Sequence, residues 1–165
     1  NQRNLYLRFA IVFLFVNLIG FCGYYIHPAA PPWYVMKYGF EPILNTPGDV
    51  AGLGRFDAMT GLGIFDSLYS RNSNVFAAVP SLHSAYMVIA FYYSLKAKYP
   101  NSLRVVFGII MLGIWFTAVY SAHHYIIDAI LGAGCALLGI FVFEKILLKW
   151  PAFARFIHRY TDYIS

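Results

Sequence analysis

Residues 105–122 are eighteen consecutive residues without a charged side chain, and this run limits the possible fold more than any other feature. A transmembrane helix needs about 20 predominantly apolar residues, so a run of this length is a candidate span. The whole chain agrees with that interpretation, because 60% of its 165 residues are hydrophobic and only 12% are charged. Soluble domains carry about 25% charged residues. The sequence therefore predicts an all-α fold, a polytopic transmembrane helical bundle.

Three more apolar segments complete the predicted bundle. Residues 5–26 carry a single charge, Arg8, and Asn17 in their middle suits a hydrogen bond between helices. Residues 82–98 end in lysines that can extend toward the headgroups. We expect spans at 5–26, 82–98, 104–122 and 125–148, in a single membrane domain, 1–165. Because the chain begins at Asn1 with no signal peptide, we expect it to be part of a longer protein, with earlier membrane helices missing.

The segment between the first two spans, residues 27–80, is the least apolar part of the chain. Prolines end the first helix, and Trp33 and Tyr34 suit the headgroup layer as aromatic anchors or as a rim around a lipid site. The glycines that follow match neither a phosphate-binding loop nor a dinucleotide fingerprint. We expect short interfacial helices in this loop. A loop of this length is more often functional than idle.

The basic residues predict how the chain is oriented. Four spans place nine of the twelve on one side: Arg3, Arg8, Lys96, Lys98, Arg104, Lys145, Lys149, Arg155 and Arg159. Cytoplasmic segments are enriched in Lys and Arg, so the loop 27–80 is predicted to be extracytoplasmic and the tail 149–165 cytoplasmic. The net charge of +5 follows membrane sidedness and forms no stripe for nucleic acid. We expect an integral, multi-pass membrane protein.

Two polar stretches interrupt the apolar pattern at span ends, and such residues are costly to place near a membrane. The first contains Pro80, Ser81 as a helix N-cap, and His83; the second contains His124 and Asp128. From His83 the chain crosses the membrane, turns and returns, so the two histidines are expected at the same depth on neighbouring antiparallel helices. The predicted sidedness puts both at the extracytoplasmic face.

His124 and Asp128 are spaced i, i+4, so they share one helix face, and the carboxylate can hold a proton on Nδ1. His123 lies about 100° away around the helix and is the poorer partner for Asp128. Three interpretations fit this set. It could be a metal site, although no further ligand is clustered with it. It could be a structural or pH-sensing polar network, or a covalent catalyst in which one histidine attacks and the other protonates the leaving group.

The motif Pro80-Ser81-Leu82-His83-Ser84, followed by His124-Tyr125-Ile126-Ile127-Asp128, resembles the type-2 phosphatidic acid phosphatase superfamily. With Pro31-Pro32-Trp33-Tyr34 and the doubled His123-His124, the chain is most similar to its inositol phosphorylceramide synthase branch. The resemblance covers residues 28 to 145. It implies that His124 is a nucleophile that becomes a phosphohistidine, that Asp128 orients it, and that His83 is the acid and later the base, with no metal or cofactor.

The chain departs from the superfamily at two motifs. Thr117 and Ala118 stand where many members have Ser-Arg, an arginine that the synthase branch also lacks, and no clean Lys/Arg-Pro motif precedes Pro80. A transferred phosphoryl group needs cationic donors, and the basic residues on the predicted face are Lys37, Arg55 and Arg71. Arg55 and Arg71 are the preferred candidates. Further expected phosphate- or substrate-binding residues are Ser81, Ser84, His123, Tyr125, Trp33, Tyr34 and Lys37.

The predicted function is transfer of an inositol-phosphate-type headgroup from a phospholipid to a ceramide-type lipid alcohol through a phosphohistidine. The expected partners are these two lipids and the membrane, while the sequence gives no indication of a partner subunit. Two alternatives remain open. A lipid phosphate phosphatase would use the same residues with water as the acceptor. A non-catalytic lipid-binding subunit would use the polar set only to join helices.

Overall fold

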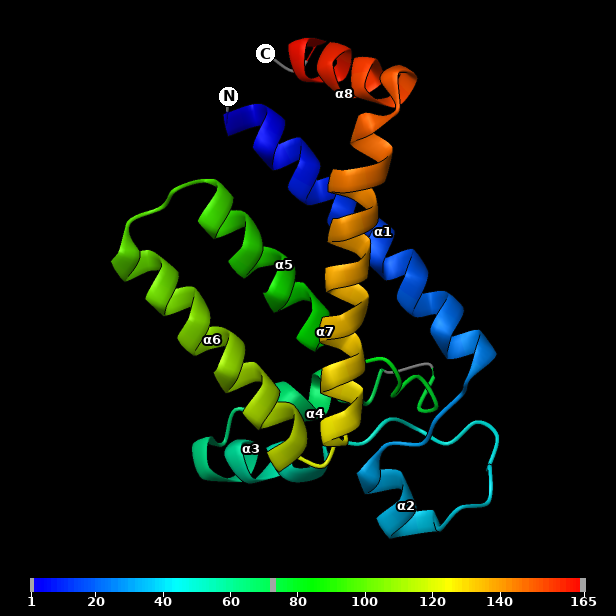
Figure 1. Cartoon of the computed structure of the whole chain (residues 1–165). Helices are drawn as coiled ribbons and strands as arrows, with labels where there is room; N and C mark the ends of the chain where they lie inside the picture. Colours follow the sequence, from blue (N-terminus) through cyan, green and yellow to red (C-terminus); the bar gives the residue numbers. More distant parts are fainter. Residues whose placement is uncertain (1, 72–73, 164–165) are drawn as a thin grey trace.

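The computed structural model describes residues 2–71 and 74–163, and its regular structure is helical (Figure 1). The long helices are α1 (Gln2–Ile26), α5 (Leu82–Lys96), α6 (Asn101–Tyr120) and α7 (Ile126–Phe141). Short elements fill the loop between α1 and α5: α2 (Pro32–Tyr38), a 3₁₀ turn (Ala51–Leu53), α3 (Gly54–Thr60) and α4 (Ile64–Tyr69). α8 (Pro151–Tyr163) follows α7. No strand occurs among the described residues, so the all-α prediction is confirmed.

Three of these helices are long and apolar enough to cross a membrane: α1, α6 and the helical segment 126–149. That last segment begins as α7 and continues through a π-helical turn, Val142–Ile146, and a 3₁₀ turn, Leu147–Lys149. The chain is therefore an integral membrane protein. α5 has 15 residues, which span only about 22 Å at 1.5 Å per residue. It ends at Lys96, two residues before the predicted boundary, and its role as a fourth span stays a prediction.

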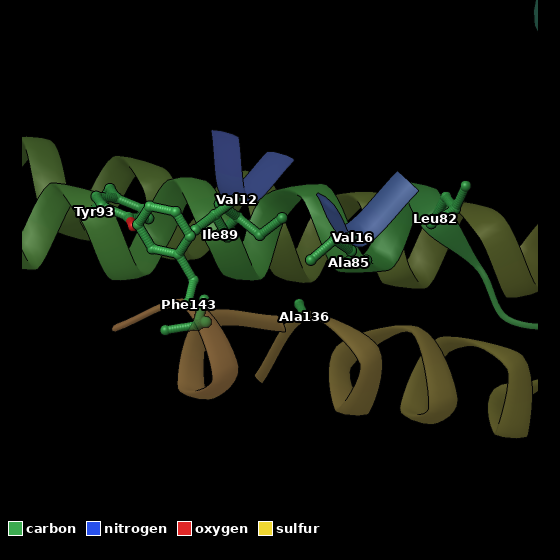
Figure 2. Packing of buried hydrophobic residues seen from close by; sticks show 9 residues of the cluster. Val12, Val16, Leu82, Ala85, Ile89, Tyr93, Ala136 and Phe143 are labelled. Atoms are coloured by element: carbon green, nitrogen blue, oxygen red, sulfur yellow. The ribbon is translucent and has the colours of Figure 1, made fainter. Parts of the chain in front are cut away.

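α5 packs against α1, α6 and α7, and the cluster of buried hydrophobic residues forms where α5 meets α1 and α7 (Figure 2). Val12 and Val16 of α1 are fully buried there, together with Ala85 and Ile89 of α5 and Ala136 of α7. Small residues permit close contacts between these helices. A Cβ atom at Gly139 of α7 would lie 2.4 Å from Val16, and one at Gly20 of α1 would lie 2.4 Å from Leu82. The first contact places α1 against the end of α7, and the second places α1 against the start of α5.

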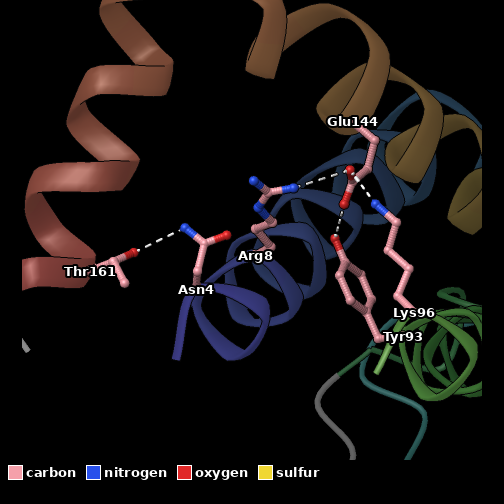
Figure 3. Close-up of polar contacts among 6 residues, drawn as sticks. All are labelled: Asn4, Arg8, Tyr93, Lys96, Glu144 and Thr161. Carbon is pink, nitrogen blue, oxygen red and sulfur yellow. Dashed lines mark hydrogen bonds and ion pairs between the residues drawn. The ribbon is translucent and has the colours of Figure 1, made fainter. Parts of the chain in front are cut away.

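The two ends of the bundle differ in their polar groups. α2, α3 and α4 gather at the end where α5 and α7 begin, whereas α8 lies across the opposite end, near the N-terminus (Figure 1). At that opposite end, the Glu144 carboxylate accepts hydrogen bonds from Tyr93 at 3.0 Å and Lys96 at 2.5 Å (Figure 3). Arg8 lies 3.6 Å from the same carboxylate. This cluster joins α1 and α5 to the π-helical turn.

Candidate active site

The starts of α5 and α7 lie directly beside each other. The Ser81 amide donates a 3.0 Å hydrogen bond to the Asp128 carbonyl oxygen. Gly132, one turn further along α7, permits this approach, because a Cβ atom there would lie 2.1 Å from the Ser81 carbonyl oxygen. The arrangement brings His83 of α5 and His124, just before α7, to a distance of 6.3 Å between ring centroids. The structure thus brings together the two histidines predicted to meet.

The Asp128 carboxylate lies beside the His124 ring. The Asp128 side chain is fully buried, and Oδ2 lies 3.5 Å from His124 Nδ1. The same oxygen accepts a 2.9 Å hydrogen bond from the Tyr125 amide, which fixes the carboxylate at the first turn of α7. Within the described residues, His124 Nδ1 has no hydrogen-bond partner. The carboxylate is therefore the group positioned to hold a proton on Nδ1, which leaves Nε2 to act as a nucleophile or base.

A cavity of about 550 Å³ opens beside the two histidines. Its walls come from α1, α5, α6 and the loop between α1 and α5. The residues that line it from the helices include Phe21, Tyr24, His83, Tyr86, Ile110, Gly113 and Thr117. No Lys, Arg, Asp or Glu of the described segments 2–71 and 74–163 is part of the lining. The cavity combines a mostly apolar wall with two imidazoles, which suits a lipid with one reactive polar group.

His123 has a different environment from His124, although the two are adjacent. Its Nε2 lies 3.1 Å from the Asp49 carbonyl oxygen, so this nitrogen must carry the proton and donate. Its Nδ1 lies 2.9 Å from the Ser121 hydroxyl, which donates to it in the neutral ring. Burial lowers the pKa of His123 below its ordinary value, which favours this neutral form. Both ring nitrogens of His123 are therefore engaged.

Of the remaining predicted binding residues, two line the cavity. Trp33 lines it, as does His123. Ser81 and Ser84 are fully buried behind the start of α5, where the Ser84 hydroxyl lies 3.3 Å from that of Ser81. Tyr34 is also buried, and its hydroxyl bonds the main chain of Glu41 and Ile43. Tyr125 is exposed and lies outside the lining.

The predicted phosphate-binding cations do not reach the cavity lining in this structure. Lys37 forms an ion pair with Asp49. Arg55 donates a 3.3 Å hydrogen bond to the Tyr120 hydroxyl, and its guanidinium lies 5.9 Å from the centre of that ring. Arg71 is exposed.

Two tyrosines that line the cavity, Tyr86 and Tyr69, were not predicted as site residues from the sequence. Tyr86 lies one helical turn after His83, with ring centroids 6.3 Å apart, and its hydroxyl donates a 2.5 Å hydrogen bond to Asn17. The i, i+3 spacing from His83 is the signal that could have identified it. The bond also confirms the interhelical role predicted for Asn17. The ring of Tyr69 in α4 lies 4.2 Å from the His123 ring between centroids, a contact that no sequence spacing indicates.

The described residues offer no group of three or more His, Cys, Asp and Glu side chains arranged to hold a metal ion. The His–His–Asp set consists of two imidazoles and one carboxylate: the His124 ring lies beside the Asp128 carboxylate, and the His83 ring lies 6.3 Å from the His124 ring between centroids. Such a set can divide nucleophilic attack and proton transfer between two rings.

The family model and the relatives found by comparison with known proteins agree with one another. The family described as the PAP2 superfamily matches residues 1–142. Phosphoinositol dihydroceramide synthase of Bacteroides thetaiotaomicron is 64% identical over 99% of the chain, and the match covers 54% of that protein. Inositol phosphorylceramide synthase of Candida albicans is 34% identical over 86% of the chain and 29% of its own length. The inositol phosphorylceramide synthase catalytic subunit of Saccharomyces cerevisiae is 33% identical over 72% of the chain, which covers 29% of that subunit.

The chain therefore spans about half the length of the first of these relatives and about a third of the other two. No solved structure matches the chain.

Proposed function

The chain belongs to the PAP2 superfamily, and from that premise we propose that it carries the active site of a membrane phosphotransferase. The proposed reaction moves an inositol-phosphate-type headgroup from a phospholipid to a ceramide-type lipid alcohol. The observation that carries the proposal is the pair His83 and His124, 6.3 Å apart beside an apolar cavity, with Asp128 3.5 Å from one of them. The names of the relatives, which are synthases of inositol phosphorylceramide type, support the choice of substrates.

In the first step, Nε2 of His124 attacks the phosphorus atom of the donor. A P–N bond forms, the P–O bond to diacylglycerol breaks, and His83 gives its proton to the departing oxygen. Asp128 holds the proton on His124 Nδ1 and stabilises the positive charge that develops on the ring. In the second step, His83 takes the proton of the acceptor hydroxyl, whose oxygen attacks phosphorus while the P–N bond breaks. The lipid products are diacylglycerol and the new phosphodiester.

The surroundings of the histidines support a lipid substrate. The cavity continues from His83 along α5 to Ile110 and Gly113 near the middle of α6, with Phe21 and Tyr24 of α1 on another wall. An acyl chain in this space would replace apolar contacts with the bilayer by apolar contacts with the protein. The excess of basic residues at the opposite end of the bundle supports an extracytoplasmic active site.

Arg55 and Arg71 remain the proposed phosphate-binding cations, with Lys37 as a third candidate. A donor phosphate near His124 would attract an exposed guanidinium, and the bonds of Arg55 to Tyr120 are of the weak, exposed kind that a phosphate can replace. If either arginine binds the donor, Arg55→Gln or Arg71→Gln will raise KM for the phospholipid. An unchanged KM in both variants would remove these residues from the site.

The test of the proposed function is a transfer assay with the purified protein in lipid nanodiscs, using headgroup-labelled phosphatidylinositol and ceramide. His124→Ala and His83→Ala are expected to abolish formation of labelled inositol phosphorylceramide. His158→Ala is the matched control, because this exposed histidine of α8 pairs with Asp162 at the far end of the bundle. Full transfer by either active-site variant would refute the mechanism. Release of phosphate from phosphatidic acid without transfer to ceramide would replace the proposed function by a phosphatase.

A further inference from the structure

The loop between α1 and α5 covers the cavity and is attached to the turn that carries His124. We call its described residues, 27–71 and 74–80, the covering loop. Its attachment uses three hydrogen bonds to three consecutive residues. The Trp33 amide donates to the Ala122 carbonyl oxygen at 2.9 Å, and the Gly52 amide donates to the Ser121 carbonyl oxygen at 3.0 Å. The third is the bond from His123 to Asp49.

The bond from His123 is the only one of these three that a side chain makes, so its strength depends on residue identity. Asp49 is held in place on the loop side, because its carboxylate pairs with Lys37 and accepts a 2.7 Å hydrogen bond from the Ala51 amide. On the other side, the Ser121 hydroxyl fixes the ring through Nδ1. His123 immediately precedes the proposed nucleophile, so the bond from its ring connects the covering loop directly to the turn that carries His124.

The covering loop presents mainly apolar side chains to the cavity. Its lining residues are Pro31, Trp33, Leu53, Phe65, Tyr69, Asn74, Val75, Ala77 and Ala78. Beneath them, the His124 side chain is only 12% exposed. Enclosing a reactive intermediate among apolar groups protects it from hydrolysis. The covering loop therefore has the position and composition to keep bulk water from His124.

We propose that His123 is a positioning residue that sets the choice of acceptor, by fastening the covering loop over His124 so that a lipid alcohol reaches the phosphohistidine and water does not. This inference rests on the proposed function. In transfer, the alcohol oxygen bonds to phosphorus, the P–N bond to His124 breaks, and the alcohol proton passes to His83. In hydrolysis, a water molecule takes the place of the alcohol, its proton passes to His83, and free inositol phosphate leaves. Loosening the covering loop favours the second outcome.

The experiment measures the ratio of free inositol phosphate to inositol phosphorylceramide formed from labelled phosphatidylinositol and ceramide. Two variants of His123 separate its two bonds. In His123→Gln, the amide nitrogen can occupy the position of Nε2 and still donate to Asp49, so the ratio is expected to stay near the wild-type value. In His123→Asn, the shorter side chain cannot reach Asp49, and the ratio is expected to rise about fivefold, as for the loss of one hydrogen bond from the closed state.

Gly52→Ala tests the same inference without changing any histidine, and it decides the matter if His123→Asn does not fold. Its Cβ atom would lie 2.8 Å from Cα of Ser121, which pushes the covering loop away from the turn. The control is Gly134→Ala, since a Cβ atom there meets nothing within 4 Å. A raised ratio in Gly52→Ala and not in Gly134→Ala supports the inference. A wild-type protein that transfers, with an unchanged ratio in His123→Asn and Gly52→Ala, overturns it, whereas a wild-type protein without transfer overturns the proposed function.

Discussion

The main-chain hydrogen bond from Ser81 to Asp128 joins the first turn of α5 to the first turn of α7 at 3.0 Å. Ser81 lies two residues before His83, and Asp128 lies four residues after His124. The spacing of the two histidines is therefore set by main-chain geometry and does not depend on a bond between their side chains. Any change that separates these two turns should reduce activity even when every proposed catalytic residue is present.

Gly132→Ala is the substitution that separates them. The new Cβ atom would lie 2.1 Å from the Ser81 carbonyl oxygen, so α5 and α7 must move apart. We expect a loss of stability of about 1–3 kcal/mol and a lower rate of transfer. Thermal unfolding in detergent and the transfer assay measure the two effects. Gly134→Ala is the matched control on the same helix, and equal behaviour of the two variants would show that the close contact at Gly132 has no influence.

Asp128→Asn tests the carboxylate separately from the fold. The amide oxygen can still accept the hydrogen bond from the Tyr125 amide, so the start of α7 is retained. The negative charge 3.5 Å from His124 Nδ1 is lost, and with it the group that stabilises the charged ring during attack. We expect a fall in kcat of about 100-fold or more with a small change in melting temperature. A kcat within a factor of about two of wild type would remove Asp128 from the mechanism.

His123 should make stability depend on pH. Burial lowers its pKa in the folded protein, and the nearby His124 and His83 act in the same direction, while Asp49 opposes them. The unfolded ring keeps a pKa near 6.5. The unfolded state therefore binds a proton first as the pH falls, so the contribution of His123 is complete above pH 6.5 and is lost progressively below it.

The measurement for this dependence is the melting temperature between pH 7.5 and 5.5. His123→Gln cannot titrate at this position, and its melting temperature is expected to fall less than that of the wild-type protein. The difference between the two curves isolates His123 from His83 and His124, which are present in both. Parallel curves would contradict the prediction.

Glu144→Gln should destabilise the end of the bundle opposite the histidines. The Glu144 side chain is 7% exposed, and the variant removes the charge that pairs with Lys96 and Arg8. We expect a loss of about 2 kcal/mol, as for hydrogen bonds between charged groups. Asp162→Asn is the control, since its partner His158 is exposed and such pairs contribute little. The same thermal unfolding assay measures both, and a control that loses as much stability as Glu144→Gln would refute the prediction.

The features of this chain that could be predicted from its sequence are those that follow a regular spacing. Long apolar runs predicted the helices, and the length of one membrane crossing and return predicted that His83 and His124 would meet. The partners of the covering loop follow no spacing. His123 bonds Asp49, 74 residues away, and Arg55 lies on Tyr120, through contacts that depend on how a glycine-rich segment folds back. The helix α5 ends at Lys96, two residues before the end of the predicted span, and Lys98 just beyond it adopts a positive φ of 55°, which the preference of lysine for helices does not indicate.

The size of the cavity also bears on the order of events. A volume of about 550 Å³ is that of a site for one drug-sized ligand, and the same pair of histidines serves both steps of the proposed reaction. Under the proposed mechanism, diacylglycerol leaves before the lipid alcohol enters, so the protein would alternate between a free and a phosphorylated form and follow ping-pong kinetics. Product and acceptor would then compete for one space, and an accumulation of diacylglycerol in the bilayer is expected to slow the second half of each cycle.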